Sequence, residues 1–428
     1  MNRSPIAWAA VGLALRLVFA LFYWTGEPLS HDEREYLALA RSVATGGGFT
    51  YPRDEPSPGT AQRFGRAPGY PAFLAALRVL EPQTTAPVRV KVAQSLVGAA
   101  GVWLIGLIAA RAAGPRAGAI AAAIAALYPP LVWMPAYVLS ETVYSTIALA
   151  AALLLDRVAD GEAHSRTAVA AGALIGIGIL VRPAMVLFLP FVFAWLARRK
   201  NRGLKLATLV MAAALACVLP WTLRNARVYH RLVFVASEGG VTFWTGNHPL
   251  SRGEGDLAAN VALKRAELEF RDAHPGLTAE QLEPLYYRDA WRRIAADPLW
   301  WLGLLARKAF YTVVPIGPSY TLHSAKYFAA SAISYGLLLP FAIAGAWRLR
   351  RRPFDSAGRG LAQGRPMALW LMAAATVAAN LLFLPQERFR IPVIDPALIV
   401  TAAALGRGGA RGGGNVAEHE RAGGHTDV

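Results

Sequence analysis

The sequence predicts an all-α polytopic integral membrane protein, and this prediction depends on its composition and its long hydrophobic runs. Of the 428 residues 55% are hydrophobic, yet 44 Lys and Arg outnumber 27 Asp and Glu, which gives a formal net charge of +17. A membrane protein needs such apolar spans and places basic residues in loops beside lipid headgroups. Excess positive charge is also typical of nucleic-acid-binding proteins. The apolar spans favour the membrane, and we expect no nucleic acid as a partner.

Ten hydrophobic runs approach the length that crosses about 30 Å of hydrocarbon, so we expect about ten transmembrane helices. They cover approximately residues 6–24, 92–111, 117–137, 141–158, 168–181, 184–197, 204–221, 327–347, 366–385 and 391–406. The fifth and sixth runs are short, and Arg182 and Pro183 between them predict a hinge, because proline ends or kinks a helix.

Charge in the short loops predicts which side of the membrane each segment faces. With the N-terminus inside, the short and densely basic segments 111–116, 198–205 and 348–352 are cytoplasmic. The long segments 25–91 and 222–326 are then periplasmic, since long segments cross largely regardless of their charge. We therefore expect a multi-pass protein of the bacterial inner membrane whose active site faces the periplasm.

This topology divides the chain into four parts. They are an N-terminal transmembrane module (1–221) that carries the first periplasmic loop (25–91), a periplasmic segment (222–326), C-terminal transmembrane helices (327–406) and a disordered cytoplasmic tail (407–428).

The first periplasmic loop is too long for a passive connector. Tyr36, Leu39 and Val43 recur at helical spacing, which predicts an amphipathic juxtamembrane helix lying on the membrane and ended by three glycines at 46–48. A second such helix is predicted over residues 71–80.

The periplasmic segment has a different character from the first loop. It is charged and helical in pattern, and it finishes with Trp300 and Trp301. Tryptophan is enriched where helices meet the headgroup region, so we expect a small periplasmic subdomain that returns to the membrane there.

Acidic residues stand at the outer ends of two predicted helices. Ser30 and Glu33 fit a capping box, which gives Glu33 a structural explanation but leaves the Asp32 carboxylate free to act as a catalytic base. Ser140 and Glu141 repeat the pattern at the fourth run, where Ser140 can cap and Glu141 can favour the first turn. Asp32, Glu33 and Glu141 are the candidate catalytic residues, and two acids on one face could divide acceptor deprotonation from substrate positioning.

Four arginines are expected near the outer surface: Arg66, Arg182, Arg388 and Arg390. A lone interfacial arginine usually reaches toward lipid phosphate. Their recurrence at one depth favours a phosphate-bearing substrate, which guanidinium groups bind bidentately. Arg66 has no acidic residue within five positions.

The sequence shows no pattern typical of a metal-binding site. The eight histidines show no metal-ligand spacing, and the single Cys217 lies inside a hydrophobic run. We therefore predict no metal site and no required cofactor, although the acidic residues leave a divalent metal open.

Several short motifs, in this order along the chain, resemble the dolichyl-phosphate-mannose–protein mannosyltransferase and aminoarabinose-transferase group of the glycosyltransferase C superfamily. The motifs are Asp32-Glu33 with Tyr36 and Ala40, Arg66-Ala67-Pro68-Gly69-Tyr70-Pro71, Ser140-Glu141-Thr142, Leu180-Val181-Arg182-Pro183, Pro220-Trp221-Thr222-Leu223-Arg224-Asn225, Gly246-Asn247 and Arg388-Phe389-Arg390-Ile391-Pro392.

The resemblance implies a polyprenyl-phosphate-linked sugar donor and transfer on the extracytoplasmic face. It implies that Asp32 is the catalytic acid and that Arg66 contacts the donor phosphate. Tyr36 and Tyr70, which stand in the same motifs, are taken with the arginines as substrate-binding residues. Ala67 departs from the aminoarabinose transferases, which carry a proline there.

These observations predict a glycosyltransferase that moves a hexose or pentose to a glycan, lipid or protein acceptor. Asp32 would act as general base, and simple displacement predicts inversion at the anomeric centre. The alternative is a transporter or flippase of lipid-linked sugars without transfer chemistry, which would favour broken helices and charges at mid-membrane. The acids of this chain cluster at one surface, which favours transfer.

Overall fold

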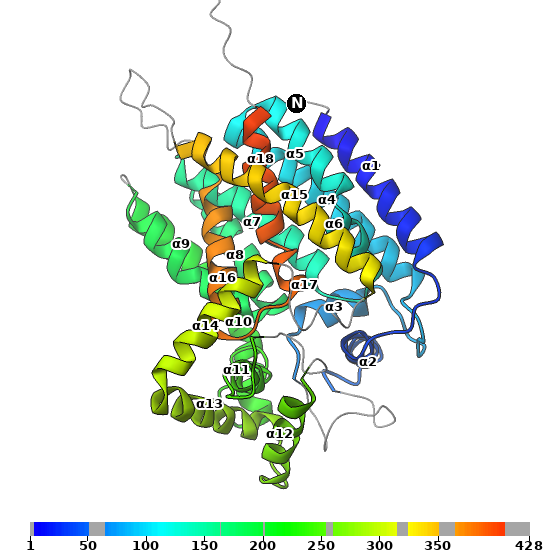
Figure 1. The fold of residues 1–428 in the computed structure, drawn as a ribbon, viewed down its shortest axis with the longest axis vertical. Coiled ribbons are helices and arrows are strands. Elements are labelled where there is room, and N and C mark those ends of the chain that lie inside the picture. Colours follow the sequence, from blue (N-terminus) through cyan, green and yellow to red (C-terminus); the bar gives the residue numbers. More distant parts are fainter. Residues whose placement is uncertain are drawn as a thin grey trace, which may run out of the picture.

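The computed structural model describes residues 4–50, 65–162, 164–199, 202–253, 260–314, 324–350 and 364–406. Within these ranges the regular elements are helices, and one isolated β-bridge joins Pro28 and Thr85. The predicted all-α membrane fold is thus confirmed (Figure 1). The predicted tail at 407–428 lies outside the described residues.

In chain order, the helical elements are α1 (Ser4–Val18), η1 (Phe19–Tyr23), α2 (His31–Ala44), α3 (Gly69–Ala76), α4 (Val88–Ala113), α5 (Pro115–Leu127), α6 (Pro129–Trp133), η2 (Met134–Ala136), α7 (Glu141–Ala159), α8 (Ser165–Val181), η3 (Pro183–Leu187), α9 (Phe188–Ala197), α10 (Gly203–Tyr229), α11 (Gly239–Gly246), α12 (Val261–Asp272), α13 (Ala279–Ala296), α14 (Pro298–Val313), α15 (Ala325–Arg350), α16 (Met367–Leu382), α17 (Glu387–Arg390), α18 (Ile394–Ala403) and η6 (Ala404–Gly406).

Each predicted hydrophobic run coincides with one of these helices or with two or three consecutive ones. Among the described residues, five helices are long and apolar enough to span a membrane: α1 with η1, α4, α7, α10 and α15. Helix α5 and the following α6 with η2 (Pro129–Ala136) are bent by 64° and add a sixth if they form one span. The elements α8, η3 with α9, α16 and α18 with η6 are shorter apolar helices. The exact count of ten spans is therefore not confirmed.

Prolines interrupt the helices at two places. The hinge at Arg182 is confirmed: α8 ends at Val181, Arg182 is extended, and η3 begins at Pro183. The residue before a proline is driven out of helical conformation, and Tyr128 before Pro129 shows the same effect. By contrast α10 continues through Pro220 to Tyr229, beyond the predicted end at 221.

The segment predicted to be the first periplasmic loop contains the two expected helices, with one correction to their environment. Helix α2 forms as predicted, but its apolar face is covered by protein rather than by lipid: Leu39 is buried in a cluster with Phe49, Tyr229 and Val233. Helix α3 packs on α2 and spans Gly69–Ala76, earlier than the predicted 71–80.

Helices α11 to α14 form a subdomain on one side of the long helices (Figure 1). Its core surrounds Trp244, which is 1% exposed. Lys308 of α14 attaches it to α16, because its Nζ donates hydrogen bonds to the carbonyl oxygens of Leu381 (3.0 Å) and Phe383 (2.7 Å). Lys308 also donates to Asn247 Oδ1 (3.1 Å), so one ammonium group joins the ends of α11 and α16.

Gly246 allows this attachment because of its size. A Cβ at this position would lie 1.9 Å from the Phe383 carbonyl oxygen, so only glycine fits where α11 meets the chain leaving α16. The motif Gly246-Asn247 is therefore explained by packing.

The topology is testable with introduced cysteines. In a Cys217→Ala background, we expect Glu81→Cys and Ala279→Cys to react with an impermeant maleimide in intact spheroplasts, because both positions are exposed and lie on the predicted periplasmic side. Ser165→Cys, exposed at the start of α8, should react only after permeabilisation. Reaction of Ala279→Cys but not of Glu81→Cys would contradict a shared face for the two segments.

Candidate active site

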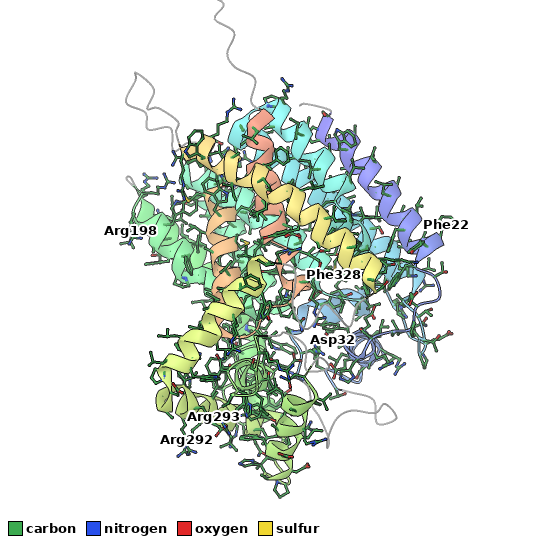
Figure 2. The ribbon with its side chains drawn as sticks, viewed as in Figure 1. Phe22, Asp32, Arg198, Arg292, Arg293 and Phe328 are labelled. Carbon is green, nitrogen blue, oxygen red and sulfur yellow. The ribbon has the colours of Figure 1, made fainter. Side chains whose placement is uncertain are left out.

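A cavity of about 2430 Å³ opens between the long helices and the α11–α14 subdomain. Its wall includes residues of α2, α7, α17 and the segment that leads into α11. Figure 2 shows Asp32 at this level, between the long helices and the subdomain. The predicted residues that line it are Asp32, Tyr36, Arg66, Glu141, Arg182 and Arg388.

The first turn of α2 aims Asp32 into this cavity. The predicted capping box is present: Ser30 Oγ accepts a hydrogen bond from the Glu33 backbone N–H (3.4 Å), and Glu33 Oε2 accepts one from the Ser30 backbone N–H (2.7 Å). Glu33 Oε1 accepts a third, from the Val138 backbone N–H (2.8 Å). Both oxygens of this buried carboxylate are therefore occupied by backbone N–H groups, and Glu33 is not among the residues that line the cavity, so the structure gives it a structural role.

Asp32 lies between two arginines. Its Oδ1 is 2.7 Å from Arg66 Nη2, and its Oδ2 is 2.8 Å from Arg388 Nη1. Burial by itself would raise the pKa of Asp32, but the two guanidinium groups outweigh that effect and hold the pKa well below its usual range. Asp32 is consequently ionised throughout the physiological pH range.

Arg66 is surrounded by carboxylates that its sequence neighbourhood does not reveal. Besides Asp32, its Nε lies 2.8 Å from Glu35 Oε2 and 3.2 Å from Glu238 Oε1. Its guanidinium also stands 5.1 Å from the centre of the Tyr36 ring. The fold thus brings three acids to Arg66 although none lies within five positions of it in the downstream or upstream sequence.

Glu141 and its two arginine neighbours extend this network. Glu141 Oε1 is 2.8 Å from Arg182 Nη1 and 3.8 Å from Arg388 Nε. Arg182 also faces the rings of Phe389 (4.7 Å) and Tyr144 (5.7 Å). The predicted cap at Ser140 does not form, because Ser140 itself has helical backbone angles and its side chain caps nothing.

The site is therefore a row of alternating charges. Its members, in spatial order, are Glu35, Arg66, Asp32, Arg388, Glu141 and Arg182. They come from α2, the segment before α3, α17, the start of α7 and the hinge after α8, so the row joins parts of the chain that are far apart in sequence. We call it the charge row.

Two predicted substrate-binding residues lie outside the cavity. Tyr70 is fully buried, donates a hydrogen bond to Gln94 Oε1 (3.0 Å) and supports the Tyr36 ring edge-on at 4.9 Å. Arg390, which is 2% exposed, pairs with Asp395 at 2.8 Å. Both are structural, because their polar groups are already paired beneath the site.

Sequence reasoning missed the acids that the 222–326 segment contributes. Glu238 lies at the cavity wall beside Arg66, and burial raises its pKa. Glu283 of α13 faces the N–H groups of Gly239 and Gly240, and burial raises its pKa to about 7. No motif or spacing marks either residue, since they approach the charge row only through the packing of α11 on α13.

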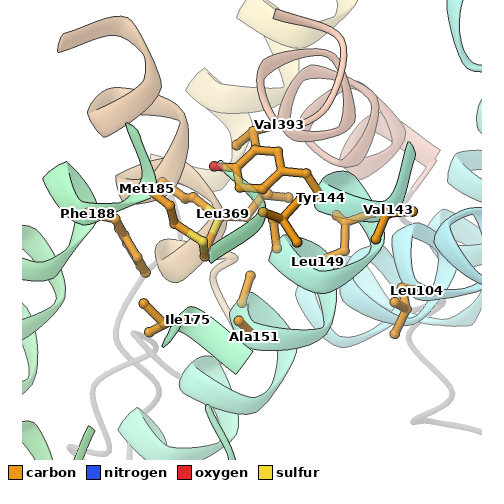
Figure 3. Close-up of a cluster of buried hydrophobic side chains, with 14 of the residues drawn as sticks. Leu104, Val143, Tyr144, Leu149, Ala151, Ile175, Met185, Phe188, Leu369 and Val393 are labelled. Carbon is orange, nitrogen blue, oxygen red and sulfur yellow. The ribbon is translucent and has the colours of Figure 1, made fainter. Parts of the chain in front are cut away.

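Part of the cavity lining is hydrophobic, and we call this part the apolar arm. It includes Val186 and Phe188, together with Met372 and Ala375 of α16, a helix that packs against η3 and α9. Met185 and Phe188 belong to the buried cluster of Figure 3, so the floor of this arm is tightly packed hydrophobic side chains. The arm begins beside Arg182, because η3 follows that residue directly.

The charge row does not fit a metal ion. Among the described residues, no group of three or more His, Cys, Asp or Glu side chains could hold one. Asp32 and Glu141 both approach Arg388, whose guanidinium occupies the position between them that a shared cation would need.

Comparison with known proteins agrees with the motifs. Residues 66–223 match the family model of dolichyl-phosphate-mannose–protein mannosyltransferases, a segment that includes Arg66, Glu141 and Arg182. The resemblance stated from the sequence is thereby confirmed. No curated protein matches the sequence.

Solved structures with the same fold share little sequence with this chain. The oligosaccharyltransferase of Archaeoglobus fulgidus in its apo form matches with a TM-score of 0.54 at 15% identity, over 95% of this chain and 50% of that one. The oligosaccharyltransferase AglB from Archaeoglobus fulgidus, in complex with an inhibitory peptide and a dolichol-phosphate, matches with a TM-score of 0.52 at 14% identity, over 94% of this chain and 50% of that one. This chain thus spans about half the length of those relatives.

A weaker similarity involves ArnT from Cupriavidus metallidurans bound to undecaprenyl phosphate. It has a TM-score of 0.42 at 15% identity, over 94% of this chain and 77% of that one.

Lys308 attaches the α11–α14 subdomain to the end of α16 at Leu381 and Phe383. The chain that leaves α16 there leads to Arg388, so this attachment also supports the position of Arg388. We expect Lys308→Met to lower the unfolding temperature by several degrees, since it leaves buried carbonyl oxygens without donors. Arg307→Met, at the exposed neighbouring position, is the matched control and should leave the unfolding temperature unchanged. Equal stability of the two variants would contradict a role for Lys308 in the attachment.

Glu283 predicts a pH dependence of stability. A carboxyl whose pKa is raised on folding stabilises the folded state fully below its unfolded pKa near 4.5, and that contribution is lost as the pH rises through about 7. We expect the unfolding temperature to fall between pH 5 and pH 8, and Glu283→Gln to reduce this fall. The exposed Glu269→Gln should keep the wild-type pH dependence, and an unchanged profile in Glu283→Gln would refute the assignment.

Proposed function

We propose that this protein is a membrane glycosyltransferase that moves a sugar from a polyprenyl-phosphate-sugar donor to an acceptor on the periplasmic face of a bacterial inner membrane. The observation that carries the proposal is the meeting of the apolar arm with the charge row at Arg182 and Arg388. The family match and the dolichol-phosphate bound to the archaeal relative support this donor class.

The donor would bind with its lipid tail along the apolar arm and its phosphate at Arg182 and Arg388. Among the described residues Arg182 has one carboxylate partner, Glu141, so it can turn donors toward a phosphate at little cost. Arg388 lies 2.8 Å from Asp32 and 3.8 Å from Glu141, so it would bind the phosphate by giving up part of its contact with Asp32. Arg66, which the sequence suggested for this contact, already faces three carboxylates, so its proposed role is to hold Asp32 in place.

Asp32 is the proposed general base. It would accept the proton of an acceptor hydroxyl or amine while that atom bonds to the anomeric carbon. The bond from the anomeric carbon to the phosphate oxygen breaks, and its electron pair leaves with the polyprenyl phosphate. Arg182 and Arg388 would stabilise the charge that develops on the leaving phosphate. Displacement in one step inverts the anomeric centre.

The pairing of Asp32 with Arg388 links donor binding to base strength. In the empty site the guanidinium holds the pKa of Asp32 low, which makes the carboxylate a weak base. A donor phosphate would compete with Asp32 for the Arg388 guanidinium. As Arg388 pairs with the phosphate, it stabilises the ionised form of Asp32 less, and the pKa of Asp32 rises. The base therefore strengthens when the donor is in place, which limits deprotonation to loaded enzyme.

We expect Asp32→Asn to lower the rate of transfer about 10²- to 10⁴-fold, the usual contribution of a general base, while donor binding is retained. The measurement is turnover of purified protein with a polyprenyl-phosphate sugar in detergent or vesicles. Glu33→Gln is the control: it should lower the unfolding temperature, because it disturbs the capping box, yet leave turnover per folded molecule near wild type. Turnover of Asp32→Asn within threefold of wild type would remove Asp32 as the base.

Two substitutions of Arg388 separate the contribution of its charge to donor binding from that of its bidentate geometry. Arg388→Ala is expected to raise the apparent donor constant about 10- to 150-fold, since a charge-assisted contact is worth roughly 1.5–3 kcal/mol. Arg388→Lys should restore part of the affinity, because lysine keeps the charge but cannot bind bidentately. Donor that crosses vesicle membranes without any transfer product would instead indicate a flippase.

A further inference from the structure

Arg16 is a charged residue inside the first membrane-spanning helix, and the proposed transfer reaction does not use it. It is 1% exposed, and within the described ranges no carboxylate lies within ion-pair distance of it. A buried charge in a membrane segment is costly, so it persists where it has a partner or a role.

The surrounding backbone is built to receive this guanidinium. Nη1 donates to the Gly12 carbonyl oxygen (2.9 Å) and Nη2 to that of Ala125 (3.4 Å). The Ala125 carbonyl has no helical donor, because the residue four positions later is Pro129, which lacks an N–H. A Cβ at Gly98 would lie 3.0 Å from Arg16 Nε, so glycine there keeps space beside that atom.

The space beside Nε is a small cavity of about 20 Å³, enough for one water molecule. Arg16, Glu141 and Thr142 all line it. Each has one buried polar atom without a hydrogen-bond partner: Arg16 Nε, Glu141 Oε2 and Thr142 Oγ1. A donor, a charged acceptor and a hydroxyl thus border one cavity of molecular size.

We propose that a single ordered water in this cavity accepts from Arg16 Nε–H and donates to Glu141 Oε2 and Thr142 Oγ1, which makes Arg16 a positioning residue for Glu141. One water satisfies all three unpaired atoms at once. It also gives the buried arginine a counter-charge across the cavity. Glu141 Oε1 faces Arg182 and Arg388 and orients both arginines. The proposed water would hold the other oxygen of the same carboxylate, Oε2, and so fix the position of Glu141.

A double-mutant cycle measured by thermal unfolding tests the coupling between Arg16 and Glu141 without any assumption about activity. It compares unfolding temperatures of wild type, Arg16→Met, Glu141→Gln and the double variant, with Leu15→Met on the exposed side of α1 as the control. We expect each single variant to lower the unfolding temperature and the double variant to lose no more than the worse single one, as for residues that act as a unit. Losses that simply add would overturn the proposal.

A second cycle guards against an Arg16 variant that does not fold. Thr142→Val removes the hydroxyl from the same cavity, and its loss should also be non-additive with that of Glu141→Gln. Independent losses in this pair would contradict the shared water.

The kinetic consequence rests on the proposed function. Arg16→Met should raise the apparent donor KM about tenfold with kcat changed less than threefold, because arginines positioned by Glu141 bind the phosphate, and Arg16→Lys should recover part of this. An arginine that only stabilises the fold would leave KM per folded molecule unchanged, which would refute the positioning role. Absence of transfer in wild type would refute the proposed function alone, since the stability cycles would still report the coupling.

Discussion

The site depends on the mutual neutralisation of charges that cannot be buried singly. An isolated carboxylate or guanidinium removed from water costs several kcal/mol, and pairing with hydrogen bonds offsets that cost only in good geometry. The charge row achieves this by alternation, since Asp32 and Glu141 each lie within 4 Å of two arginines. Removal of any one member leaves its neighbours with an unbalanced charge. The row therefore fixes five distant parts of the chain relative to one another.

Breaks in the helices bring several of these charged side chains into contact. The hinge at Pro183 ends α8 early, so Arg182 leaves the helix and turns toward Glu141. The break at Pro129 frees a carbonyl oxygen for Arg16, and the short α17 carries Arg388 back toward Asp32. Irregular backbone at membrane depth is tolerated where it lines a polar cavity. Here the irregular segments position two arginine side chains, Arg182 and Arg388, and one carbonyl oxygen, that of Ala125.

Local rules predicted the parts of the site that are local. The capping box at Ser30, the helix that follows it and the hinge at Arg182 depend on residues within a few positions, and all three form as expected. Pairing across the fold was not accessible: Glu238 reaches Arg66 only because the segment before α11 folds over the cavity. The cap expected at Ser140 does not form, because a capping residue needs a non-helical backbone and the backbone of Ser140 is helical.

The same balance of charges sets a condition on any substrate. Around the arginines of the charge row stand four described carboxylates: Asp32, Glu35, Glu141 and Glu238. A phosphate adds further negative charge, so the site must gain a proton or release an arginine from an acid. Glu238 can take that proton most readily, because burial raises its pKa and the nearby Glu35 and Asp32 raise it further, against the opposing effect of Arg66. Proton uptake at Glu238 would leave Asp32 ionised and available as the base, since Asp32 is held between the guanidinium groups of Arg66 and Arg388.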